Sequence, residues 1–320
     1  MRIIVLLLLL NFILPFNTTF GQIGNSLISN EITIDLQPPY PQPGENFTAS
    51  LNDYSGGAFG STITWIVDGE KIDDAANLRS LDLTAPLTGT RKVQIVLNTP
   101  SGTQKVVTKI IRPVYLDVII EPQTHVPRFY KGRALPSIGS TVNATALVSD
   151  GNGFRNTDLI YTWRLNHKTL GGGAIRGHNR ISFTAPMDND AILTLQVSEP
   201  NGTVIAQRSF LLPIIEPEIK FYSVNPLLGI SNKTVENDAV VTGNTISLQA
   251  EPYHLDLRVY NNPDFTKWTV NGREVDNNDA NPYFITLQRN NFGQSSQIGF
   301  EVRDLTQVLQ GAKSNTYIKF

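Results

Sequence analysis

The residues of this chain whose side chains could most readily act in catalysis or bind a metal are its histidines. Four are present, and they lie far apart or in separate turns: His125, His167, His178 and His254. A zinc ion needs three or four converging ligands, so this pattern favours isolated histidines at the surface or in turns. The sequence also lacks the Gly-x-Ser-x-Gly, His-Glu-x-x-His and Gly-Lys-Ser/Thr motifs. It therefore predicts no catalytic residue, no metal and no cofactor.

Acidic and amide side chains gather in two short segments. Oxygen-rich loops of this kind can bind calcium, and calcium would stiffen the joints of an exported repeat protein. Neither segment has the spacing of an EF-hand loop, and Asp and Asn are ordinary turn residues. Turns are the preferred interpretation, with calcium as the open alternative. The two segments contain Asp150, Asn152, Asn156 and Asp158, and Asp276, Asn277, Asn278 and Asp279.

One aromatic and basic segment stands out as a candidate contact for a partner. It includes Phe129, Tyr130, Lys131 and Arg133, within a long insertion that runs from Gln123 to Ile138. Exposed aromatics beside arginine can anchor a protein or stack on a sugar ring. The alternative is that the insertion folds back over the junction between the first and second repeats.

The elements that position these residues are predicted from a repeat around each tryptophan. Trp65, Trp163 and Trp268 lie 98 and then 105 residues apart, each inside an apolar segment of alternating pattern. Such a spacing is about the length of one β-sandwich domain. We expect all three indole rings to lie in the core, between two sheets. A tryptophan at a binding surface is the alternative.

The turn after each tryptophan strand supports the repeat. Asp68-Gly69 and Asn271-Gly272 are typical of two-residue hairpins, because Asn, Asp and Gly accept a positive φ. Asn166-His167 takes the same place in the second repeat, which predicts a longer turn or one of another type.

The fold class follows from these patterns. Helical periodicity is absent after the first residues, and 24 glycines and 19 prolines fit short strands joined by turns. The prediction is an all-β chain of three tandem Ig-like or PKD-like sandwiches. Their expected bounds are 22–113, 114–214 and 215–320.

The first 21 residues resemble a secretory signal peptide. Arg2 precedes an apolar stretch, and the small residues Thr19 and Gly21 predict cleavage before Gln22. An uncleaved anchor is the alternative, although the stretch is shorter than a bilayer requires. The absence of cysteine excludes disulfides and favours a bacterial envelope protein. A net charge of -2 without a basic cluster argues against nucleic-acid binding.

Taken together, the strand order, the tryptophans and the lack of disulfides resemble exported bacterial proteins built from Ig-like or PKD-like repeats. Three segments are also similar to a three-repeat exported family of bacteria with small genomes: 127–136, 225–229 and 250–253. This resemblance implies a secreted or envelope location and assigns no activity.

The functional prediction is a non-catalytic spacer or adhesion scaffold. It would bind another envelope protein or an extracellular polymer through its loops and inter-domain seams. The alternatives are a carbohydrate-binding protein that lacks its own enzyme, and a hydrolase with two carboxylates in a cleft.

Overall fold

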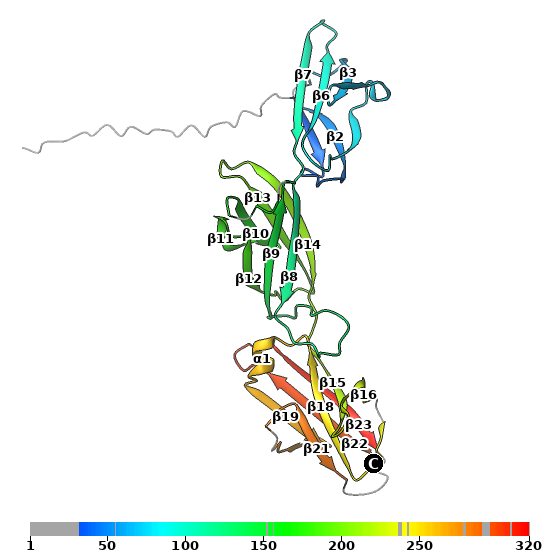
Figure 1. Cartoon of the computed structure of the whole chain (residues 1–320), viewed down its shortest axis with the longest axis vertical. Coiled ribbons are helices and arrows are strands. Elements are labelled where there is room, and N and C mark those ends of the chain that lie inside the picture. Colours follow the sequence, from blue (N-terminus) through cyan, green and yellow to red (C-terminus); the bar gives the residue numbers. More distant parts are fainter. Residues whose placement is uncertain are drawn as a thin grey trace, which may run out of the picture. The chain divides into compact units, whose positions relative to one another are not determined.

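The computed structural model describes residues 32–54, 56–151, 153–155, 157–235, 239–241, 243–277, 280–289, 295–307 and 309–319 (Figure 1). The predicted signal peptide, the predicted cleavage site at Gln22 and the loop residues Asn152, Asn156, Asn278 and Asp279 lie outside these residues. None of the described helices is long and apolar enough to cross a membrane.

The described chain is nearly all β, which confirms the predicted fold class. The chain divides into two compact units. The first holds residues 32–35, Ala49–Leu81 and Lys92–Lys109, and the second holds Leu36–Thr48, Asp82–Arg91 and residues 110–319. The three predicted domain bounds do not coincide with this division and stay a prediction.

Two sheets come from the first part of the chain. One has the order β1-β2-β5, with β1 Ile32–Gln37, β2 Asn46–Asp53 and β5 Ser80–Thr84. The other has the order β4-β3-β6-β7, with β3 Thr62–Val67, β4 Glu70–Ile72, β6 Arg91–Asn98 and β7 Gln104–Ile111. A 3₁₀ turn, η1, covers Asp73–Ala75. Buried and partly exposed side chains alternate along β3 and β6, as expected of sheets with one buried face.

The next two sheets, here called the second sheet pair, share one apolar core. The three-stranded sheet has the order β12-β9-β8, with β8 Tyr115–Pro122, β9 Thr141–Ser149 and β12 Arg180–Thr184. The four-stranded sheet has the order β11-β10-β13-β14, with β10 Ile160–Leu165, β11 Lys168–Arg176, β13 Asp190–Ser198 and β14 Val204–Pro213. Neighbouring strands in both sheets pair antiparallel, and side chains such as Val142, Trp163 and Leu195 fill the core.

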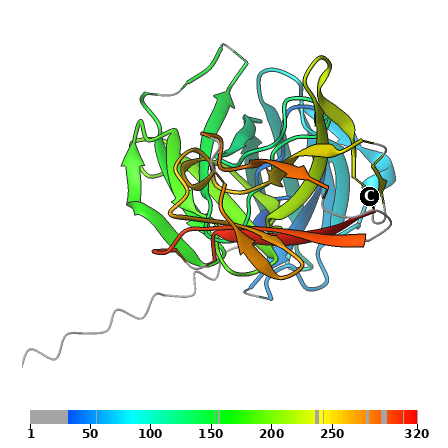
Figure 2. The ribbon, with the colours of Figure 1, turned by 90° about the horizontal axis from the view of Figure 1, so that it is seen from below.

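The last two sheets form the third sheet pair, coloured yellow to red and seen from another direction in Figure 2. One has the order β16-β15-β18-β21, with β15 Glu218–Asn225, β16 Gly229–Thr234, β18 Thr245–Tyr253 and β21 Phe284–Gln288. The other has the order β17-β23-β22-β19-β20, with β17 Ala239–Val240, β19 Phe265–Val270, β20 Arg273–Val275, β22 Ser295–Arg303 and β23 Gly311–Lys319.

A five-residue helix, α1 Leu257–Asn261, follows β18. The side chain of Asp256 caps its start by accepting a hydrogen bond from the Arg258 N–H. A helix of little more than one turn is too short to show a periodic pattern in the sequence.

Each tryptophan lies in the interior. Trp65, Trp163 and Trp268 are 0%, 1% and 2% exposed. Their indole N–H groups donate to the carbonyl oxygens of Leu78, His178 and Pro282, at 2.9, 3.0 and 2.9 Å. The three repeats therefore share a buried ring and also the position of the acceptor that satisfies it.

The hairpin turns decide between the two alternatives predicted for the second repeat. Two residues separate β10 from β11, as in the other two hairpins, so the second turn is not longer. The turn type does differ. Asp68 and Gly69 both have positive φ, and so do Asn271 and Gly272, whereas in the second repeat only Asn166 does. His167 lacks the conformational freedom of glycine, and a turn with positive φ at its first position alone accommodates it.

Candidate functional site

The candidate site is built on residues 123–141, called here the linking segment, which runs from the end of β8 to the first residue of β9. Its first residues pair with the chain between β18 and α1, where Thr124 forms an antiparallel bridge with Asp256. The His125 N–H donates to the Leu255 carbonyl at 2.7 Å, and the His254 N–H donates to the His125 carbonyl at 2.6 Å. A segment of the second repeat thus adds backbone hydrogen bonds to the third sheet pair.

Aromatic rings make up the next layer of this contact. The imidazole of His125 stacks on the ring of Tyr260 with centroids 3.5 Å apart and planes at 8°. Tyr260 in turn stacks on Tyr283 at 4.8 Å, and Tyr283 meets Phe300 edge-on at 5.7 Å. Phe300 packs against Trp268 at 4.6 Å. The linking segment therefore continues the aromatic core of the third sheet pair.

A short contact between a histidine and a glutamate lies in the same region. His125 Nε2 is 2.6 Å from Glu251 Oε1, and the two side chains are 13% and 7% exposed. The other carboxylate oxygen of Glu251 accepts from Gln249 Nε2 at 3.3 Å. A carboxylate removed from water in this way requires a partner, and His125 supplies one.

Two further buried side chains fasten the end of the linking segment. Asp256, 2% exposed, accepts from the Thr141 N–H at 2.9 Å. Gln310 is fully buried and accepts from the Asp256 N–H at 3.0 Å, while its amide donates to Ser137 Oγ and to the Ile138 carbonyl. One glutamine thus joins both ends of the contact through three hydrogen bonds.

The aromatic and basic residues of the linking segment are divided between this contact and the surface. Phe129 packs edge-on against Tyr222 at 5.1 Å, and Tyr130 against Tyr253 at 5.4 Å, each ring remaining about two-fifths exposed. Lys131 and Arg133 are exposed. The alternative prediction was that this segment folds back over the junction between the first and second repeats. It was wrong, because the rings of Phe129 and Tyr130 contact the third sheet pair.

Burial perturbs several titrating groups in this contact. It raises the pKa of Tyr260 to about 12 and that of Tyr253 further. The same cause lowers the pKa of His254, whose side chain lies against Tyr130 and Tyr253. The neutral forms of Tyr253, Tyr260 and His254 are therefore favoured near neutral pH.

Two histidines also correct the expectation of isolated surface residues. His254 is buried and His125 is half-buried, and the His254 N–H donates to the His125 carbonyl, although 129 positions separate the two residues in the sequence. Within the described residues, no group of three or more His, Cys, Asp and Glu side chains is arranged to hold a metal ion. His125 and His254 serve the contact instead.

The first oxygen-rich loop is organised around a cation of the chain itself. Arg155 pairs with Asp150 at 3.4 Å and with Asp158 through a short hydrogen bond. This hydrogen bond lowers the pKa of Asp158. The guanidinium thus neutralises the carboxylates that a calcium ion would need.

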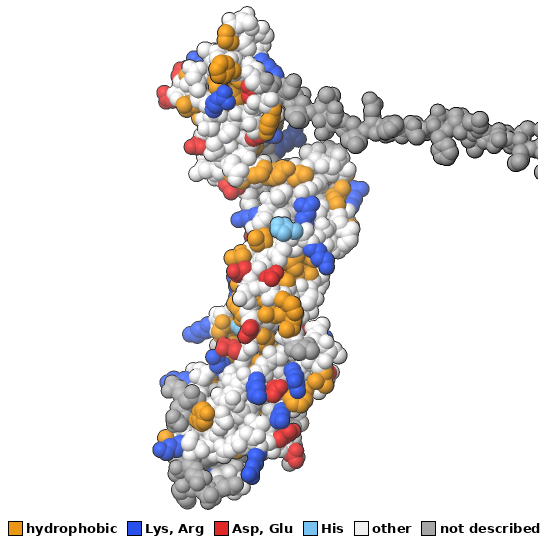
Figure 3. All heavy atoms as spheres, turned by 180° about the vertical axis from the view of Figure 1, so that it is seen from behind, with side chains coloured by type: hydrophobic (Ala, Val, Ile, Leu, Met, Phe, Trp, Pro, Cys, Tyr) orange, Lys and Arg blue, Asp and Glu red, His pale blue; other side chains and the backbone are white. Residues whose placement is uncertain are grey.

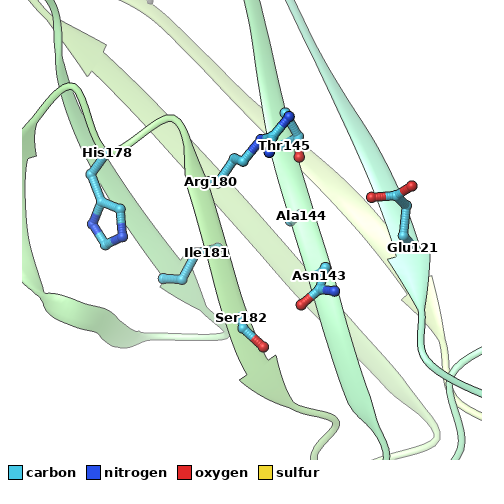
Figure 4. Close-up of a pocket in the computed structure, with 8 residues that line it drawn as sticks. All are labelled: Glu121, Asn143, Ala144, Thr145, His178, Arg180, Ile181 and Ser182. Carbon is cyan, nitrogen blue, oxygen red and sulfur yellow. The ribbon is translucent and has the colours of Figure 1, made fainter. Parts of the chain in front are cut away.

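A second feature is an open hollow of about 340 Å³ on the three-stranded sheet of the second pair (Figure 4). Six polar side chains line it from β8, β9, β12 and the preceding turn: Glu121, Asn143, Thr145, His178, Arg180 and Ser182. Within the described residues, none of these side chains makes a hydrogen bond to another part of the chain. The hollow therefore offers unused donors and acceptors to a ligand.

No protein-family model and no curated protein matches the chain. Among solved structures, three N-terminal domains of the bacteriophage RB49 highly immunogenic outer capsid protein (Hoc) are 16% identical, with 90% of this chain and 97% of that chain covered and a TM-score of 0.26. The central fibronectin-III array of RIM-binding protein is 11% identical, with 91% and 96% covered and a TM-score of 0.28. The Bacteroides ovatus protein SGBP-B, solved with a mixed-linkage heptasaccharide, is 12% identical, with 91% and 66% covered and a TM-score of 0.24. TM-scores this low do not establish a shared arrangement over the whole chain.

Proposed function

We propose that this chain is a non-catalytic spacer and binding scaffold of the cell envelope or the extracellular space. In this proposal the signal peptide is removed before Gln22, and the mature chain folds as three sandwiches with the bounds predicted above. Its partner is another envelope protein or an extracellular polymer.

This proposal is supported by the polar side chains that hold the linking segment against the third sheet pair. Four buried or half-buried polar side chains are engaged in holding the linking segment: His125, Glu251, Asp256 and Gln310. Groups so committed support a structural joint, because a catalytic acid or base must be free to exchange a proton with a substrate.

The charge distribution fits a partner other than nucleic acid. On the face seen in Figure 3, Lys and Arg side chains lie interspersed with Asp and Glu. Together with the net charge of -2, this gives no extended basic surface on that face for a phosphate backbone. Lys131 and Arg133, exposed beside Phe129 and Tyr130, remain our candidate contact for a protein partner.

A second candidate function, binding of a carbohydrate polymer, is favoured by the hollow in Figure 4. Its volume is in the range of small-ligand sites, and its side chains can donate to and accept from sugar hydroxyls. None of its lining residues is Phe, Tyr or Trp, so a bound sugar would lack a stacking platform there. Binding of this kind would be weak and would depend on hydrogen bonds.

The two functions are separated by one binding experiment on the exported full-length chain. Crosslinking in the native envelope identifies a protein partner, and a glycan array with the same preparation identifies a polymer. The doubly substituted Glu121→Ala/Arg180→Ala chain removes both charges of the hollow, and Arg164→Ala/Asp190→Ala is a matched control on the other sheet of the second pair. Glycan binding lost only in the first variant supports the second function. A specific protein crosslink retained in both supports the first, and neither signal in the wild-type chain contradicts both.

A further inference from the structure

His254 holds the linking segment through a ring nitrogen that must be free of a proton. The Leu135 N–H donates to His254 Nδ1 at 3.1 Å, and a backbone N–H can only donate. The neutral ring therefore carries its proton on Nε2. His254 itself is 5% exposed and has a left-handed φ of 60°, a conformation that fixes the ring at the base of the linking segment.

The groups that face His254 come from three elements. Tyr130 of the linking segment and the neighbouring Tyr253 lie against its ring. Glu218 on β15 raises the pKa of His254, but burial lowers it by more, so the net shift is downward. Glu218 is itself paired with Lys220 at 2.8 Å.

We propose that the part of the linking segment around Leu135 is held to the third sheet pair by a pH-sensitive joint, which is released when a proton binds Nδ1 of His254. The proton comes from solvent, and its arrival places two donors face to face, so the hydrogen bond from Leu135 breaks. This inference rests on the proposed role of the linking segment as a joint, and it adds the regulation of that joint.

The direction of the effect follows from the lowered pKa. An exposed histidine titrates near about 6.5. Because the folded contact holds the pKa of His254 below that value, its contribution to stability is complete above about pH 6.5. The contribution is lost as the pH falls from there through the folded pKa.

The first part of the linking segment is held without the ring of His254. The His125 N–H donates to the Leu255 carbonyl at 2.7 Å, and the Leu257 N–H donates to the Gln123 carbonyl at 2.9 Å. Asp256 meanwhile retains the N–H groups of Thr141 and Arg258. Acid should therefore loosen the chain around Leu135 while residues near His125 stay attached.

Spin labels can follow this change in the full chain, because the sequence has no cysteine to label by accident. We would place one label by Arg133→Cys, close to Leu135, and the other by Arg273→Cys on β20. Both positions are exposed. The distribution of distances between the two spin labels is expected to be narrow at pH 7.5 and clearly broader at pH 5.

Two variants assign the effect to one ring. His254→Asn keeps an acceptor the same number of bonds from the backbone, tolerates the left-handed φ and does not titrate. It should hold the narrow distribution at both pH values, whereas His125→Gln should still broaden in acid. Equal broadening in wild type and His254→Asn, or no broadening in wild type, would overturn the pH inference. A broad wild-type distribution already at pH 7.5 would instead contradict the joint itself.

Ring titration provides a second readout that needs no His254 variant. With ¹⁵N-labelled histidine, His254 should show the Nε2–H tautomer at pH 7.5 and should take up its proton over the pH range in which the labels separate. Broadening at a pH where the ring is still neutral, or protonation without broadening, would also overturn the inference.

Discussion

The second and third sheet pairs carry the same tryptophan strand but complete their cores differently. The second core is built mainly of aliphatic side chains around Trp163. The third core contains a row of aromatic rings that runs from Trp268 to His125 on the linking segment. A repeat can thus keep its central strand while one copy depends on a neighbour to cover its end.

The largest expected effect tests whether both cores depend on the indole. Trp163→Ala and Trp268→Ala should each cost about 3–5 kcal/mol, because a buried ring is replaced by a cavity. Residue-resolved hydrogen exchange shows which amides lose protection in each variant. Trp163→Ala should act on the second sheet pair, and Trp268→Ala should also release the linking segment. Identical exchange patterns for the two variants would remove the difference between the cores.

The next effect concerns the contact between His125 and Glu251 at the end of the third core. His125→Ala should cost about 3 kcal/mol, since it leaves the carboxylate of Glu251 without its hydrogen-bond partner and removes the stack on Tyr260. Chemical denaturation of wild type, of the two single variants and of His125→Ala/Glu251→Ala gives the interaction free energy between the two side chains. Additive losses would show that the two side chains do not interact.

Gln310 tests the other end of the contact. Gln310→Ala should cost about 1–3 kcal/mol, because it leaves buried partners without their hydrogen bonds. Its neighbour Gln307, which uses its side chain only for an exposed contact with Arg258, is the matched control. Gln307→Ala should change the free energy of unfolding by about 0.5 kcal/mol or less. An equal loss in both would argue against Gln310 as a fastener.

The smallest effect is expected in the hollow of the second sheet pair. Glu121→Ala/Arg180→Ala should leave the free energy of unfolding within about 0.5 kcal/mol of wild type, since neither side chain has a partner in the described chain. Thermal melting checks this. A clear loss of stability would mean that the two charges serve the fold rather than a ligand.

Local patterns predict much of this fold, and long-range contacts account for the rest. Alternation along the strands places Trp65, Trp163 and Trp268 inside, and Asp68-Gly69 predicts its hairpin from φ preferences alone. The destination of the linking segment could not be predicted in this way, because His125 and Glu251 are 126 residues apart.

One signal in the sequence could have indicated the contact. Strand β18 is buried along most of its length yet carries Gln249 and Glu251, which are 6% and 5% exposed. Polar side chains in such a strand require partners from elsewhere in the chain. Their identity depends on tertiary structure, so the sequence predicts the need for a partner but not His125 itself.

The central claim is that the linking segment belongs structurally to the third sheet pair. Native-state hydrogen exchange at pH 7.5 on the full chain tests it most directly, through the amides of His125, Leu135 and Thr141, whose acceptors all lie in the third repeat. We predict that these three amides exchange as slowly as those in the centre of β18. Exchange at the rate of an unprotected loop, with β18 still protected, would contradict the claim.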